Sequence, residues 1–143
     1  MQHLILAATL LFSILIFSQE SESFNLNKEK NIEVSLVNAL NDTGTVNFAL
    51  FNKENFRKQP LKAKSAIIKN GLSTVVFENV PAGTYAIICY HDENENKRMD
   101  FQENGMPLEN YGTSNNPLNF GPPQFVDSKF EVMDKDLNLE IKF

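Results

Sequence analysis

Apolar and polar residues alternate in several short segments of the chain, and this pattern limits the fold more than any other feature. Ile32, Val34 and Leu36 share one side of an extended segment, while Glu33 and Ser35 share the other side. A period of two is typical of a β-strand with one buried face. Beyond residue 18 no stretch of about ten residues carries a helical pattern. The alternation therefore predicts an all-β fold.

Seven segments fit the strand pattern: 31–40, 46–50, 63–69, 72–80, 85–90, 130–132 and 137–143. Turn-forming residues separate them, and Asn70-Gly71 is the strongest turn signal. We expect the first two segments to pair as an antiparallel hairpin. The segment 85–90 is apolar on both faces, which favours a central strand. The pattern predicts one antiparallel two-sheet Greek-key sandwich of about seven strands, with a five- or six-stranded closed barrel as the alternative.

The N-terminal residues differ in composition from the rest. No Asp, Glu, Lys or Arg precedes Glu20, and residues 4–17 are almost entirely apolar. This run is shorter than the roughly 20 residues that a membrane-spanning helix needs, and it is typical of a secretory signal peptide. We predict a signal peptide at 1–18, a linker at 19–30 and the sandwich domain at 31–143. The expected location is periplasmic or extracellular, with an uncleaved N-terminal anchor as the alternative.

Composition excludes several classes of protein. The 143-residue chain has a formal net charge of −5, whereas a nucleic-acid-binding protein needs a basic face. A single cysteine, Cys89, excludes an intramolecular disulfide and a cysteine-based zinc site. Because Cys89 alternates with apolar residues, we expect it to be a buried and inert thiol.

The segment 91–124 has little periodicity, and a connection of this length is usually functional. Oxygen-bearing side chains recur in it with the spacing of an EF-hand-type calcium loop. If Asp92 is position 1, then positions 3, 5, 9 and 12 are Asn94, Asn96, Asp100 and Glu103, and Arg98 at position 7 supplies a carbonyl oxygen. These residues predict a structural Ca²⁺ site. A solvated acidic loop that binds no ion is the alternative.

One position departs from that loop pattern. Position 6 is normally glycine, because the backbone there has a positive φ. This chain has Lys97 instead. Lys97 fits the pattern only with backbone strain or with a different chain path.

Several longer motifs resemble one known family. They are FENVPAGTYA at 77–86, HDENENKRMD at 91–100, GMPLENYGTSNN at 105–116 and PPQF at 122–125. Together they resemble the bacterial domain of unknown function 2141 family over roughly residues 31–143. The resemblance implies an exported domain with an immunoglobulin-like or transthyretin-like sandwich, and it implies no activity. The family usually has glycine where Lys97 stands and an apolar residue where Glu103 stands, while Glu109 matches its pattern and is an alternative carboxylate.

The loop also contains a candidate partner surface. It combines an aromatic side chain with small hydrogen-bonding residues: His91, Glu109, Tyr111, Ser114, Asn115 and Asn116. Such a surface could bind another exported protein or a cell-envelope glycan; a packed loop whose polar side chains bond its own backbone is the alternative.

We therefore expect an exported, non-enzymatic binding or structural module with a calcium-ordered loop. The alternative function is a cell-envelope hydrolase that uses the loop carboxylates and His91.

Overall fold

The computed structural model describes residues 28–119 and 121–143. The predicted signal peptide and most of the predicted linker lie outside these residues. The described part is almost entirely β-structure, and its one helix, α1 (Phe125–Ser128), has a single turn. The strands are β1 (Lys30–Leu36), β2 (Thr45–Phe51), β3 (Lys62–Ile67), β4 (Ser73–Val80), β5 (Gly83–Asp92), β6 (Tyr111–Thr113), β7 (Phe130–Val132) and β8 (Leu137–Ile141). No helix of the described residues is long and apolar enough to cross a membrane.

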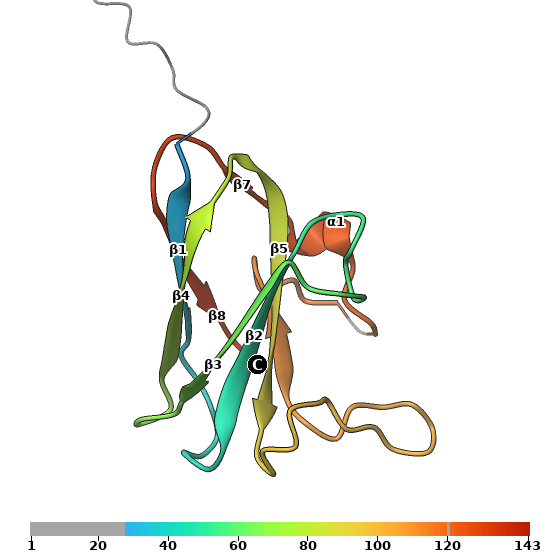
Figure 1. Cartoon of the computed structure of the whole chain (residues 1–143). Coiled ribbons are helices and arrows are strands. Elements are labelled where there is room, and N and C mark those ends of the chain that lie inside the picture. The colour runs from blue at the N-terminus through green and yellow to red at the C-terminus, as the bar shows by residue number, and fades with distance from the viewer. Residues whose placement is uncertain (1–27, 120) are drawn as a thin grey trace, which may run out of the picture.

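The strands form two facing sheets (Figure 1). One sheet has the order β4-β1-β8, and the other has the order β3-β2-β5-β6 with β7 paired to the start of β5. The predicted all-β sandwich is thus confirmed. Its strands number eight rather than seven, because β6 lies inside the segment expected to be one long loop. One pair, β1 with β8, is parallel, so the expectation of purely antiparallel sheets is wrong for this pair.

The core lies between the sheets and follows the alternation in the sequence. Every second residue of β1, β2 and β5 is buried, as in Val46, Phe48 and Leu50 of β2. The strand β5 pairs with β2, β6 and β7, which confirms the prediction of a central strand. Cys89 is completely buried there, and burial raises the pKa of its thiol.

The expected hairpin between the first two strands is wrong. The strand β1 pairs with β4 and β8, while β2 belongs to the other sheet and pairs with β3 and β5. Both strands bury one face, so the alternation alone fits either arrangement. The connection between β1 and β2 is held instead by Asp42, whose carboxylate accepts hydrogen bonds from the Asn70 and Gly71 backbone N–H groups at 2.8 and 2.9 Å.

The turn predicted at Asn70-Gly71 is present. Both residues have positive φ angles, +53° and +76°, and the neighbouring Lys69 and Leu72 form an antiparallel bridge. The turn does not close a hairpin within one sheet, because β3 and β4 belong to different sheets. It therefore carries the chain from one layer of the sandwich to the other.

Candidate functional site in the Asp92–Glu109 loop

The loop between β5 and β6 starts from a buried carboxylate at the end of β5. Asp92 has no exposed surface. Its Oδ1 accepts a hydrogen bond from the Asn96 N–H at 3.1 Å, and its Oδ2 accepts bonds from the Lys97 N–H at 2.8 Å and Asn47 Nδ2 at 3.0 Å. Asp92 therefore ties the first turn of the loop to β2 of the sheet.

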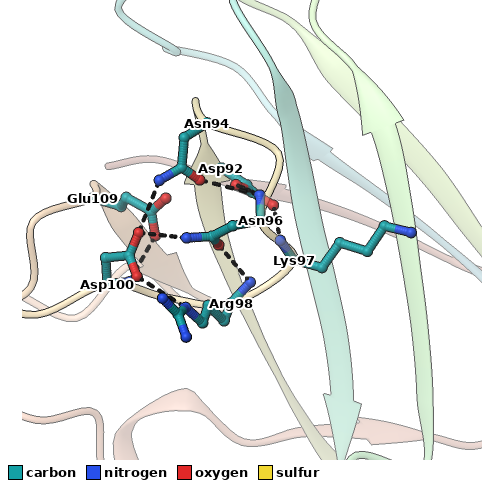
Figure 2. A network of polar contacts seen from close by, with 7 residues as sticks. All are labelled: Asp92, Asn94, Asn96, Lys97, Arg98, Asp100 and Glu109. Atoms are coloured by element: carbon teal, nitrogen blue, oxygen red, sulfur yellow. Dashed lines mark hydrogen bonds and ion pairs between the residues drawn. The ribbon is translucent and has the colours of Figure 1, made fainter.

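A second carboxylate, Asp100, lies against the amides of this turn (Figure 2). Its Oδ2 accepts hydrogen bonds from Asn94 Nδ2 at 2.9 Å and Asn96 Nδ2 at 2.6 Å, and its Oδ1 accepts one from Arg98 Nε at 3.2 Å. The hydrogen bonds from the two asparagine side chains, chiefly the one from Asn94, lower the pKa of Asp100. The loop therefore closes on itself around Asp100.

The third carboxylate is Glu109, which comes from the far end of the loop. Its Oε2 accepts a hydrogen bond from the Asp100 N–H at 3.1 Å. Its Oε1 is buried and has no hydrogen-bond partner among the described residues. Burial raises the pKa of Glu109, since the charged form loses hydration there.

A small depression of about 290 Å³ opens beside these groups. Its walls are Glu93, Asn94, Asp100, Leu108, Glu109 and Asn110. Most of these side chains are polar, and three of them are carboxylates. The depression could therefore accept a cation or a ligand rich in hydrogen-bonding groups.

The structure brings some residues of the predicted ligand set together and places another one apart from them. Asp92, Asn94, Asn96 and Asp100 gather as the spacing predicts (Figure 2). Glu103 lies outside this group, in a turn closed by the bond from the Gly105 N–H to the Gln102 carbonyl. Glu109 takes its place, because the short Phe101–Pro107 hairpin folds the chain back. The motif that flagged Glu109 was thus a better guide than the spacing that flagged Glu103.

The conformation at Lys97 follows the calcium-loop pattern. Lys97 has a φ of +64°, at the position where such loops need a positive angle. Its side chain points away from the cluster (Figure 2). Within residues 28–119 and 121–143, however, no three His, Cys, Asp or Glu side chains are grouped closely enough to hold a metal ion.

His91 is turned into the sandwich, away from this cluster. It is 1% exposed, its Nε2 donates to the Thr43 carbonyl at 2.6 Å, and its ring stacks on Phe143. Asp92, the next residue of the strand, faces the other way. The imidazole Nδ1 lies 3.7 Å from the partly exposed Glu93 Oε1, so one loop carboxylate is paired with His91, although the ring itself is buried.

Most of the predicted partner surface is engaged within the fold. Ser114 is 1% exposed, and its hydroxyl accepts the Ile87 N–H at 3.0 Å and donates to the Ser128 carbonyl. The Asn115 amide donates to the Asp127 and Lys129 carbonyls, and the Asn116 amide bonds the β8 backbone. His91 and Ser114 are too buried to contact a partner, so this part of the prediction is wrong. Tyr111 is half-buried and donates its hydroxyl to the Gly121 carbonyl at 3.0 Å.

Comparison with solved structures gives only distant likenesses. Two structures of the pilus-presented adhesin Spy0125 (Cpa), one of them a cysteine-to-alanine mutant, share 13% and 12% sequence identity with this chain, with TM-scores of 0.29 and 0.28. The alignments cover 85% and 82% of this chain but only 28% and 27% of the adhesin chains. No curated protein matches the sequence.

The family comparison is more extensive. A sequence profile described as "Uncharacterized protein conserved in bacteria (DUF2141)" matches residues 32–140. This range includes most of β1, most of β8, every element between them and the whole loop from Asp92 to Glu109. The chain therefore belongs to the bacterial DUF2141 family.

Proposed function

We propose that this protein is an exported, non-enzymatic binding or structural module whose Asp92–Glu109 loop is ordered by Ca²⁺. The apolar, uncharged residues at 4–17 support export. The partner of the module is another exported protein or a cell-envelope glycan.

The observation that carries the calcium proposal is the convergence of oxygen-bearing side chains from both ends of one loop. Asp92, Asp100 and Glu109 supply carboxylates, and Asn94 and Asn96 supply amide oxygens. Calcium takes six to eight such oxygens in flexible geometry. The Oε1 atom of Glu109, buried without a partner, supports the proposal further, because an ion would compensate its lost hydration.

Ion binding requires a local rearrangement of this loop, because Asp92, Asp100 and Glu109 must come closer together to share one ion. Asn94 and Asn96 currently direct their Nδ2 atoms at Asp100. Rotation of each amide by about 180° would replace its donor by an oxygen ligand. It would also break the bonds that Asn94 Oδ1 accepts from the Asn96 N–H and that Asn96 Oδ1 accepts from the Arg98 N–H, so the backbone of the turn must shift as well. The Arg98 carbonyl is the predicted backbone ligand, and Arg98 Nε would leave Asp100 Oδ1 free for the ion. The depression beside Glu109 provides the space for these movements.

The test is thermal unfolding of the purified protein, produced from the full chain, in 2 mM Ca²⁺ and in EDTA. Extracellular modules bind Ca²⁺ with dissociation constants of about 10⁻⁴–10⁻³ M. At the tighter value, binding adds about 1.8 kcal/mol to the free energy of unfolding. For a domain of this size we expect Tm to rise by about 5 °C.

Two variants test which residues are responsible. Asp100→Asn should keep the shape of the loop and abolish most of the calcium-dependent rise in Tm. Glu103→Gln is the matched control, because Glu103 lies outside the cluster, and it should leave the rise unchanged. An equal Tm in Ca²⁺ and in EDTA for the unmodified protein, or a larger loss with Glu103→Gln than with Asp100→Asn, would refute the assignment.

A further inference from the structure

The outward face of the larger sheet carries a continuous row of polar and aromatic side chains. Ser65 of β3 lies opposite Asn47 of β2, Asn47 lies opposite Tyr90 of β5, and Tyr90 lies opposite Tyr111 of β6. Directly opposed residues of antiparallel strands project on the same side. The strand neighbours of Asn47 are core residues, so this row faces away from the core. Across four strands it is about 14 Å long.

Two groups of loop segments flank the row on this face of the sheet. The loop 52–60 and α1 lie towards the start of β5 (Figure 1). There Phe56 packs edge-on against Phe51 and Phe125. At the other end of β5 the Asp92–Glu109 loop projects (Figure 1). Between them Ser65 is exposed, and Asn47, Tyr90 and Tyr111 are half-buried. The next row towards α1 consists of Ala63, Ala49, Ile88 and Thr113.

Hydrogen bonds fix the polar side chains of the row in place. The Ser65 hydroxyl donates to Asn47 Oδ1, Asn47 Nδ2 donates to Asp92 Oδ2, and the Tyr111 hydroxyl donates to the Gly121 carbonyl. Burial, followed by the charges of Asp92 and Glu109, raises the pKa of Tyr90 to about 12, so its hydroxyl stays protonated and able to donate. Tyrosines held in this way give a large contact area at low entropic cost.

The charges around the row restrict the chemistry of its ligand. The row itself contains no Lys or Arg, and Asp92 and Glu109 lie at its loop end. Lys97 also lies at this end, since its N–H bonds the same Asp92 oxygen as Asn47 Nδ2. Because the row itself holds no cation, it offers no pairing partner for the phosphate or sulfate groups of a polyanion. Two ring faces beside an amide and a hydroxyl suit a ligand with both C–H faces and hydroxyl groups.

We propose that the row formed by Ser65, Asn47, Tyr90 and Tyr111 binds a neutral polysaccharide. The ring faces of Tyr90 and Tyr111 contact the C–H faces of the sugar rings, while Asn47 and Ser65 exchange hydrogen bonds with sugar hydroxyls. The inference rests on the proposed role as a binding module, of which it names the surface and the ligand class, and it does not depend on bound calcium.

The test is electrophoresis of the purified protein in native gels that contain a polysaccharide. The neutral probes are amylose, laminarin (a β-1,3-glucan), xyloglucan and galactomannan, and heparin is the anionic probe. We expect at least one neutral probe to slow the protein, and heparin to have no effect. Tyr90→Ala should weaken this binding about tenfold. Phe101→Ala is the control, because Phe101 is an exposed aromatic residue in the loop hairpin, outside the row.

A second variant tests the same surface in case Tyr90→Ala does not fold. Ser65→Arg places a long side chain at an exposed position at the end of the row, and we expect it to weaken binding while Tm changes little. Retardation by none of the neutral probes, retardation by heparin alone, or equal losses in Tyr90→Ala and Phe101→Ala would overturn the proposal. Gels with Ca²⁺ and with EDTA separate the two proposals. A calcium-dependent Tm without retardation refutes the polysaccharide site alone, and retardation without any calcium response refutes the calcium site alone.

Discussion

Lys97 adopts a backbone conformation that favours glycine, although it has a side chain. Its φ of +64° lies in the left-handed region, where residues with a Cβ atom are strained. A hydrogen bond from the Lys97 N–H to the buried Asp92 carboxylate offsets this strain. A carboxylate without hydration needs such donors, so the backbone bond decides the conformation.

The substitution Lys97→Gly should therefore stabilise the protein by about 0.5–1 kcal/mol, after allowance for the greater freedom of glycine in the unfolded chain. It should leave the calcium-dependent part of the stability unchanged, because the positive φ is already present in the loop without an ion. Urea unfolding in EDTA and in Ca²⁺ measures both effects. Arg57→Gly is the matched control, since Arg57 has a φ of +58° in a different loop. A gain in stability with Arg57→Gly but none with Lys97→Gly would contradict the explanation.

Glu109 gives a prediction that depends on pH. Burial raises its pKa in the folded state above the value in the unfolded chain, so the folded state binds the proton more tightly. The resulting stabilisation is present at low pH and is lost as pH rises through the folded pKa. At pH 7 in EDTA, Glu109→Gln should then melt above the unmodified protein, and the difference should shrink towards pH 4. In Ca²⁺ the order should reverse, because the variant loses a ligand. Melting curves at both pH values, with and without Ca²⁺, measure this; a variant that melts lower in EDTA at pH 7 would contradict it.

The edge strands are blocked by individual side chains. Along β8, the Asn116 amide donates to the Glu140 carbonyl and accepts the Lys142 N–H at 2.9 and 2.8 Å, as a neighbouring strand would. Beside β4, Lys62 Nζ donates to the carbonyl oxygens of Glu78 and Asn79. Free backbone groups at a sheet edge invite pairing with another chain. These contacts indicate that the module does not assemble by strand addition along these two edges.

Asn116→Ala should therefore lower the free energy of unfolding by about 1 kcal/mol, because two hydrogen bonds to the β8 backbone are lost. The unpaired backbone groups at the edge of β8 should also increase self-association. Urea unfolding and size-exclusion chromatography at two protein concentrations measure these effects. Asn104→Ala is the control, because Asn104 is also exposed but bonds only the Met106 N–H within its own hairpin. An Asn116→Ala variant as stable and as monomeric as Asn104→Ala would refute the capping role.

The loop segments show where prediction from sequence succeeds and where it fails. The spacing from Asp92 to Asp100 predicts the first half of the candidate site, because the bonds that shape this turn are local. Glu103 lies apart from the other predicted ligands because the small hairpin at Phe101–Pro107 reverses the chain, and no alternation signals this reversal. The sequence places Tyr90 only within a strand. Its position opposite Tyr111 could not be predicted, because it depends on the pairing of two separate segments.

The same limit applies to the molecule as a whole. Alternation predicts which faces are buried and hence a sandwich, since β1, β2, β4 and β5 each bury one face in the core. It carries no information on which strand pairs with which, so the partners of β1 could not be foreseen. The predicted length of the loop after β5 is too great for a related reason. A strand of three residues, β6, is too short to show a period, yet it completes the larger sheet beside β5.

The parallel pairing of β1 with β8 has a consequence for when the chain can fold. Ile32 lies opposite Leu137 and Leu36 lies opposite Ile141, so the middle strand of the smaller sheet lacks one neighbour until the last of these strands has been synthesised. Contacts over such separations form slowly and add most of their stability late. The order of the strands thus delays completion of the smaller sheet until residues 137–141 are available to pair with β1.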